Sequence, residues 1–139
     1  ENAMPPSHIQ VVIEGDLPVV QRDPIRMEQV FQNLIDNAVT YMDKPQGVVK
    51  IACADEETHW KFSVSDNGPG IDRKYHDKIF QIFQTLAPRD EHESSGVGLT
   101  LVKKIIEQYN GSVWLASEKG KGSTFYFILP TREHDYATA

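Results

Sequence analysis

Several features are scarce or missing in this sequence. Its 139 residues include a single cysteine, Cys53, so no internal disulfide can form, which fits a reducing setting. No apolar run approaches the roughly 20 residues of a membrane-spanning helix, and the N-terminus lacks the basic flank and apolar stretch of a signal peptide. The net charge is −6, so the chain lacks the basic face that nucleic-acid binding requires. We therefore expect a cytoplasmic domain without a nucleic-acid partner or direct membrane contact.

The composition fits one soluble globular domain. Hydrophobic residues make up 40% of the chain and charged residues 24%, and 139 residues can bury a core without disulfide support. Residues 1–8 contain Pro5-Pro6 and no periodic pattern, and we interpret them as a linker or added residues. The predicted domain covers residues 9–130, and residues 131–139 form a tail.

Two amphipathic helices and several strands follow from the periodicity. Asp23 is a suitable N-cap with Pro24 at the first helical position, and apolar residues then recur at helical spacing as far as Met42. A second amphipathic helix is predicted over 97–109, with Asn110-Gly111 as its C-terminal signal. Arg73 to Phe83 predicts one or two short helices. The stretches expected as strands are 9–13, 19–20, 48–53, 60–64, 112–116 and 123–129.

The order of these elements predicts an α+β fold. Strands joined by short polar turns pair as antiparallel hairpins, and the two helices must bury their apolar stripes against the sheet. The expected architecture is a two-layer α/β sandwich, with a mixed, mostly antiparallel sheet and the helices on one face.

The first polar constellation is the pair Asn33 and Asn37 in an otherwise apolar helix. A spacing of four puts both side chains on one helix face. Their amide oxygens can coordinate a hard cation, and their NH₂ groups can bind phosphate oxygens. Two solvent-facing amides are the alternative interpretation.

Three glycine-containing turns are the other candidates. Asp66-Asn67-Gly68-Pro69-Gly70 follows a strand, where the glycines allow a ligand to approach the backbone closely. Ser95-Gly96-Val97-Gly98-Leu99 opens the second helix, and its free N–H groups can face an anion. Gly120 to Phe125 is a glycine turn entering a strand, in which polar Thr124 alternates with larger neighbours and can point into a pocket. Taken alone, each turn is a weak signal, and a purely structural turn is the favoured interpretation of the first and the last.

Taken in order, these motifs resemble a known family. The succession Asn-x-x-x-Asn, Asp-x-Gly-x-Gly, Phe-x-x-Phe, Gly-x-Gly-Leu and Gly-x-Gly-Ser/Thr-x-Phe is similar to the ATPase domain of sensor histidine kinases. That domain belongs to the superfamily shared with DNA gyrase, the heat-shock chaperone ATPases and MutL-type repair proteins. The resemblance covers roughly Ile9 to Pro130 and implies the same two-layer fold.

The resemblance implies a role for each matching residue. Asn37 would coordinate Mg²⁺ bridging the ATP phosphates, and Asn33 would be the catalytic residue that contacts phosphate or its water shell. Asp66 would accept a hydrogen bond from the adenine amine, supported by Thr124 through a water. The remaining ATP-binding residues would be Gly68, Gly70, Ile71 and Tyr41 around the base, and Gly96, Val97, Gly98 and Leu99 at the phosphates. Residues 84–95 would form a lid carrying Arg89 as a candidate phosphate contact, and Phe80 and Phe83 would anchor its base in the core.

Position 33 separates kinases from hydrolases within the resemblance. ATP-hydrolysing members carry Glu four residues before the metal-binding Asn, whereas this chain has Asn33, which cannot act as a general base. Phosphoryl transfer to an already nucleophilic imidazole depends on positioning and charge neutralisation more than on a base. The substitution also disfavours a serine kinase of the anti-sigma-factor type.

Two further features limit the predicted activity. Thr40 stands where many sensor kinases carry a basic residue, which leaves a non-catalytic ATP-sensing or adaptor domain as the alternative function, and Lys44 is the nearby candidate for the missing charge. None of the five histidines lies in a phosphoacceptor context. We expect the chain to need the dimerisation and histidine phosphotransfer domain of its parent protein, with a response regulator downstream, and not to autophosphorylate alone.

Overall fold

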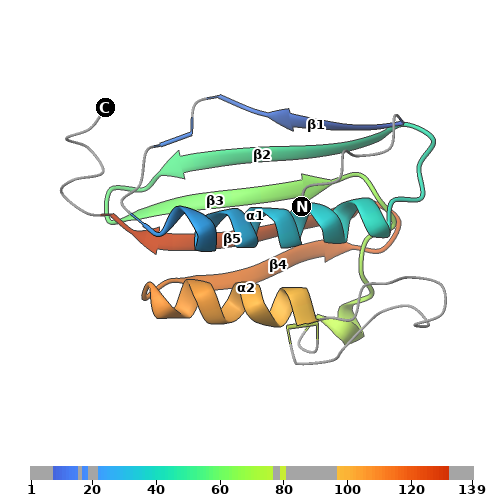
Figure 1. Ribbon diagram of the computed structural model, residues 1–139. Coiled ribbons are helices and arrows are strands. Elements are labelled where there is room, and N and C mark those ends of the chain that lie inside the picture. The colour runs from blue at the N-terminus through green and yellow to red at the C-terminus, as the bar shows by residue number, and fades with distance from the viewer. Residues whose placement is uncertain (1–7, 16, 19–21, 77–78, 81–96, 132–139) are drawn as a thin grey trace.

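The computed structural model describes residues 8–15, 17–18, 22–76, 79–80 and 97–131. A five-stranded sheet forms one layer and two helices form the other, side by side on one face of the sheet (Figure 1). The strands are β1 (Ile9–Ile13), β2 (Gly47–Asp55), β3 (His59–Asp66), β4 (Ser112–Glu118) and β5 (Gly122–Pro130). The two α-helices are α1 (Pro24–Thr40) and α2 (Val97–Gln108), and a short 3₁₀ helix, η1 (Arg73–Tyr75), lies between them in the sequence.

The sheet is mixed and mostly antiparallel, which confirms the predicted fold class. Its spatial order is β1-β2-β3-β5-β4. β1 runs parallel to β2, with Ile9 opposite Gly47, while the other three neighbouring pairs are antiparallel. The last hairpin therefore inserts β5 beside β3, which places the start of β5 next to the end of β3.

The helix ends follow their sequence signals closely. The Asp23 side chain accepts a hydrogen bond of 2.9 Å from the Ile25 N–H, and Pro24 occupies the first helical position. The helix ends at Thr40, two residues before the predicted Met42. After α2, Asn110 adopts a φ of 66° and the Gly111 N–H donates to the Ile106 carbonyl at 2.9 Å. The predicted strand at 19–20 and the predicted lid at 84–95 lie outside the described residues.

The core lies between the helices and one face of the sheet. Alternate residues of β5, namely Phe125, Phe127 and Leu129, are buried together with Trp60, Phe62 and Val64 of β3. The Phe62 and Phe127 rings stack with centroids 4.8 Å apart, and Phe31 of α1 meets both rings edge-on. The helices contribute Val30, Leu34, Ala38, Val102, Ile105 and Ile106.

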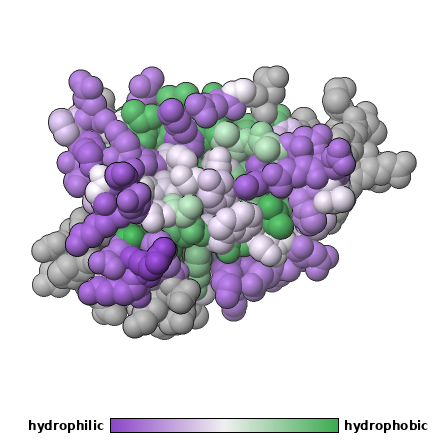
Figure 2. Space-filling view, turned by 180° about the vertical axis from the view of Figure 1, so that it is seen from behind, coloured by the Kyte–Doolittle hydropathy of each residue, from purple (hydrophilic) through white to green (hydrophobic). Residues whose placement is uncertain are grey.

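The opposite face of the sheet carries no described helix, and we call it the uncovered face. Figure 2 views the molecule from this side, where hydrophilic and intermediate residues surround smaller hydrophobic areas. The intervening residues of β3 and β5, among them Lys61 and Tyr126, are only partly buried. Tyr126 stacks on Trp114 of β4, with the Lys61 ammonium 4.8 Å from the Tyr126 ring centroid. No helix in the described part of the chain is long and apolar enough to cross a membrane.

The two faces of β5 predict unequal stability effects. Phe127 is fully buried and packs against two other aromatic rings. We expect Phe127→Ala to reduce the free energy of unfolding by about 3–5 kcal/mol, as is typical for emptying a buried phenylalanine site. Urea denaturation is the measurement. Tyr126→Ala on the uncovered face is the matched control and should cost clearly less, so equal losses would contradict this assignment of the core.

Candidate functional site

A small pocket lies where the end of α1 faces the end of β3 and the start of β5. It encloses about 80 Å³ and is lined by Asn37, Ala38, Tyr41, Asp66, Pro69, Gly70, Ile71 and Ser123. Five of these residues, Asn37, Tyr41, Asp66, Gly70 and Ile71, were selected from the sequence as binding residues. The structure therefore brings together side chains that lie up to 86 positions apart, from Asn37 to Ser123.

Helix α1 supplies one wall of the pocket. Asn37 and Tyr41 are four residues apart and share a helix face, with Ala38 buried beside them. Asn33, one turn earlier, does not line the pocket. Its side chain instead faces the start of α2, where a Cβ added to Gly98 would be 3.1 Å from Asn33 Oδ1. A glycine at 98 thus allows α2 to begin close to the Asn33 amide.

Asp66, the last residue of β3, supplies the only carboxylate among the described residues that line the pocket. Its Oδ1 accepts a hydrogen bond of 2.9 Å from the Gly68 N–H, and the Ser123 backbone N–H also donates to this carboxylate. Burial raises the pKa of Asp66 above its ordinary value, and the negative charge of Asp43 raises it further. The two backbone hydrogen bonds and the charge of Lys44 lower this pKa but do not cancel the effect of burial.

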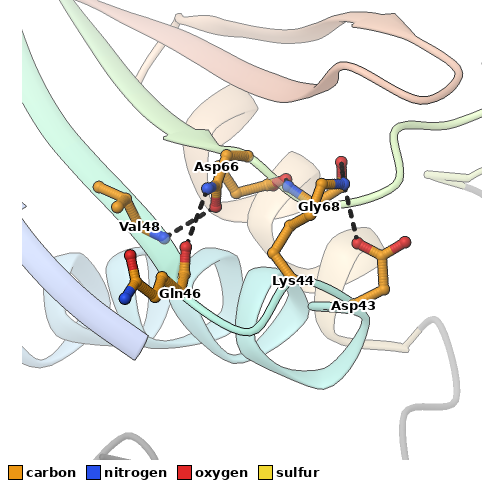
Figure 3. Close-up of polar contacts among 7 residues, drawn as sticks. Asp43, Lys44, Gln46, Val48, Asp66 and Gly68 are labelled. Atoms are coloured by element: carbon orange, nitrogen blue, oxygen red, sulfur yellow. Dashed lines mark hydrogen bonds and ion pairs between the residues drawn. The ribbon is translucent and has the colours of Figure 1, made fainter. Parts of the chain in front are cut away.

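Asn67 and Lys44 hold the loop after β3 through contacts that the sequence did not predict. Asn67 Oδ1 accepts a hydrogen bond of 2.8 Å from the Val48 N–H, and its Nδ2 donates to the Gln46 carbonyl at 3.1 Å. Lys44 reaches from the loop after α1 to Asp43, 3.1 Å away, and to the Gly68 carbonyl, 3.4 Å away (Figure 3). These bonds fix the backbone that carries the Asp66 and Gly68 contacts.

Glycine is required where this loop meets the β4–β5 turn. Gly70 has a φ of 76°, and a Cβ there would lie 2.2 Å from the Glu118 carbonyl oxygen. Gly122 has a φ of 103°, and its Cβ would lie 2.2 Å from the Asp66 carbonyl oxygen. In both cases the neighbouring atom belongs to the backbone and cannot move aside as a flexible side chain could. These two glycines therefore allow the loop after β3 and the β4–β5 turn to pack closely together. The Gly120 N–H donates to the Pro69 carbonyl across the same contact.

Thr124 lies away from the pocket in this structure. Its hydroxyl lies 2.7 Å from Ser65 Oγ, on the uncovered face of the sheet, and it does not line the pocket. Ser123, the preceding residue, is buried on the helix side and does line the pocket. Successive strand residues point to opposite faces, so the residue two before buried Phe125 shares the pocket side. The sequence carried this signal, because Phe125, Phe127 and Leu129 mark the buried face.

The remaining predicted residues occupy different places. Ile71 lines the pocket, and its N–H donates to Ser117 Oγ at 2.8 Å. Val97 is the first residue of α2, and Leu99 is buried in the core. Phe80 meets Phe125 edge-on with centroids 5.9 Å apart, as expected for a core anchor. Arg89, Gly96 and Phe83 lie outside the described residues. Among the described residues, no three His, Cys, Asp or Glu side chains gather as a metal-binding group.

The sequence was compared with known protein families. Residues 22–133 match the family described as "Histidine kinase-, DNA gyrase B-, and HSP90-like ATPase". The chain belongs to this family.

Relatives and solved structures place it among the histidine kinases of that family. The chain is 47% identical over 116 residues to the phytochrome-like protein Cph1 of Synechocystis sp., covering 84% of this chain and 16% of Cph1. It is 39% identical over 119 residues to the adaptive-response sensory kinase SasA of Synechococcus elongatus, covering 85% of this chain and 30% of SasA. The structure of the catalytic domain of histidine kinase ThkA superposes on this chain with a TM-score of 0.72 at 29% identity. The superposition covers 88% of this chain and 79% of the ThkA catalytic-domain chain.

These comparisons agree with the motif order in the sequence. The chain is an ATP-binding catalytic domain of the histidine-kinase type, and it spans a minor part of the length of the curated relatives it matches.

The raised pKa of Asp66 predicts how this family member responds to loss of the charge. Because burial raises the folded-state pKa above the unfolded value of about 3.9, the ionised carboxylate opposes folding at neutral pH. We expect the nucleotide-free Asp66→Asn variant to be at least as stable as the parent near pH 7. That difference should shrink as the pH falls through the folded-state pKa of Asp66, because the parent carboxyl then becomes neutral.

Thermal unfolding at neutral and mildly acidic pH measures this effect. Asp36→Asn, which removes an exposed carboxylate from α1, is the control and should change stability little. An Asp66→Asn variant that is clearly less stable than the parent near neutrality would show that the carboxylate stabilises the fold, contrary to this prediction.

Proposed function

We propose that this domain binds Mg²⁺-ATP in the pocket beside Asp66 and transfers the γ-phosphate to a histidine on a separate domain of its parent protein. The observation that carries the proposal is one pocket that joins a partly buried carboxylate at the end of β3 to the Asn37 face of α1. A ligand spanning the two would meet a hydrogen-bond acceptor at one end and amide groups at the other.

The Asp66 end suits adenine. An ionised carboxylate only accepts hydrogen bonds, so Asp66 would accept from the exocyclic amine of adenine, whereas guanine presents a carbonyl at that position. Ile71 and Tyr41 would form apolar walls for the ring. Gly68 and Gly70 would shape the pocket by keeping the loop close to Asp66, and Ser123 takes the place first assigned to Thr124.

The other end suits phosphates. Asn37 would supply an amide oxygen to Mg²⁺, which usually takes only one or two protein ligands alongside phosphate oxygens and water. The residues fit this ion because Asn37, whose amide oxygen is a suitable ligand, lines the pocket. When bound, Mg²⁺ would neutralise phosphate charge. Asn33 would contact phosphate or its water shell, and the first N–H groups of α2, from Val97 and Gly98, would donate to phosphate oxygens. Arg89, Gly96 and Leu99 stay predictions for the same end.

The chemistry left to this domain is positioning. Asn33 carries no carboxylate that could activate water, and an imidazole nucleophile needs no strong base. The acceptor histidine would come from the dimerisation and histidine phosphotransfer domain of the parent protein, which would pass the phosphate to a response regulator. We place this reaction in the cytoplasm.

A non-catalytic ATP-sensing or adaptor domain is the second candidate, and the observation that favours it concerns charge. Thr40 leaves the phosphate end without a basic residue at that position of α1. Lys44 does not replace it in this structure, because its ammonium lies at the Gly68 carbonyl, 3.4 Å away, on the Asp66 side. ATP binding alone therefore does not separate the two candidates.

Nucleotide binding provides the first test. Calorimetry with a non-hydrolysable ATP analogue and Mg²⁺ should detect binding by the parent domain. Asp66→Asn should weaken binding by about 1–3 kcal/mol, the scale of a lost buried polar contact. Ser63→Ala, on the same strand but the uncovered face, should bind like the parent. Absence of binding at millimolar analogue would refute both candidate functions, and equal affinity of Asp66→Asn would refute the adenine contact.

Phosphotransfer separates the kinase from the adaptor. The domain alone should acquire no label from radiolabelled ATP. Mixed with its parent's dimerisation and histidine domain, it should label that partner, and Asn37→Ala should reduce the labelling strongly because Asn37 is the proposed Mg²⁺ ligand. A partner domain that stays unlabelled although ATP is bound would favour the adaptor function.

A further inference from the structure

Two serine hydroxyl groups in contact with each other lie beside the pocket, and the proposed ligand contacts do not explain why they are paired. Ser117 of β4 and Ser123 of β5 are register partners with their Oγ atoms 2.9 Å apart. Ser123 is the only buried polar side chain among the described residues, and it lines the pocket beside Asp66. Ser117 does not line that pocket but contacts the loop that does.

The hydrogen-bonding capacity of Ser117 is fully used. Its Oγ accepts from the Ile71 N–H at 2.8 Å and donates to the Gly122 carbonyl at 3.0 Å. A serine hydroxyl has one donor and two acceptor sites. With its donor committed to Gly122 and one acceptor site to Ile71, Ser117 has only an acceptor site left for Ser123. The proton in the 2.9 Å contact must therefore belong to Ser123.

With its proton directed to Ser117, the Ser123 hydroxyl can only accept hydrogen bonds from a ligand in the pocket. A hydroxyl that donates to Ser117 presents only its lone pairs elsewhere, so Ser123 acts as an acceptor. Its neighbour Asp66 is also an acceptor when ionised, and the Ser123 backbone N–H is already bound to the Asp66 carboxylate. The base end of the pocket thus offers two acceptors and no side-chain donor from these two residues.

We propose that Ser117 is a specificity-determining residue that acts through Ser123: it holds the Ser123 hydroxyl as an acceptor, so that the pocket favours a base with an amine donor over one with a carbonyl. This inference rests on the proposed adenine-nucleotide function and deepens it. Ser117 touches no ligand and is a positioning residue. Without it, the Ser123 hydroxyl is free to rotate and donate to a carbonyl oxygen.

The test compares ATP with ITP, whose base carries a carbonyl in place of the amine. Titrations with Mg²⁺ give the ratio of the two dissociation constants for the parent and for Ser117→Ala. We expect the parent to favour ATP, and Ser117→Ala to reduce that preference by about 3–10-fold, the scale of one neutral hydrogen bond. Ser117→Thr keeps the hydroxyl and should retain the preference of the parent.

A double-mutant cycle separates specificity from stability. Ser117→Ala leaves the Ile71 N–H and the Gly122 carbonyl without this partner, so it should lower the melting temperature whether or not Ser123 is present. Its effect on the ATP-to-ITP ratio should disappear in the Ser123→Ala background, because no hydroxyl remains to reorient. Thr124→Ala, one residue along on the uncovered face, should leave the ratio unchanged.

The possible outcomes distinguish failure of the proposed function from failure of the role of Ser117. If the parent binds neither nucleotide, the proposed function fails and the role of Ser117 fails with it. If the parent prefers ATP and Ser117→Ala keeps the same ratio, only the role of Ser117 is overturned. A ratio that Ser117→Ala changes equally in the Ser123→Ala background would also overturn it, because Ser123 would then not be the residue through which Ser117 acts.

Discussion

The partly buried carboxylate of Asp66 is the constraint on which the site depends. Desolvation raises its pKa, so the fold must compensate the ionised form with hydrogen bonds. Those donors come from the backbone of Gly68 in the following loop and of Ser123 on the adjacent strand. Both segments are in turn fixed in place, the loop by Asn67 and Lys44, and the start of β5 by the glycine at 122 that lets its backbone approach the Asp66 carbonyl. The loop, the turn and two strands therefore meet at one charged group. Side chains with a shifted pKa of this kind are frequent at binding sites.

Local signals in the sequence were sufficient for the elements but not for their spatial order. Asp23 and Pro24 define the start of α1, and alternation of buried residues defines β5, because caps and periodicity act within one element. The insertion of β5 between β3 and β4, and the parallel pairing of β1 with β2, depend on contacts between distant segments. The expectation of a mixed, mostly antiparallel sheet was correct because hairpins dominate the order of strands, whereas the particular neighbours could not be obtained from periodicity.

The same division applies to the site. Asp66, Asn37 and Tyr41 could be predicted as neighbours because motif order and helix spacing are properties of the sequence, and all three line one pocket. Thr124 and Ser123 lie on opposite faces of the sheet because they are adjacent in β5, and the alternation of Phe125 and Phe127 indicates that Ser123 shares the pocket side. The role proposed for Ser117 could not be predicted from sequence, because it depends on a cross-strand register and on a hydrogen bond to a loop 46 residues away. Residues that act through others leave little local signature.

The described contacts divide the proposed reaction between a fixed end and an open end. The base end is built from strand ends, backbone hydrogen bonds and glycine contacts, so its shape and polarity are set before any ligand arrives, which lowers the cost of binding. At the phosphate end, Asn33 lies against Gly98 at the start of α2, and neither residue offers a proton acceptor comparable to a carboxylate. On the proposed function, Asn33 and Gly98 would hold a triphosphate without themselves activating water. Productive transfer then requires a nucleophile that is already reactive, and an imidazole supplied by another domain meets that requirement. The absence of a general base at position 33 would thus protect bound ATP from hydrolysis until the acceptor histidine is presented.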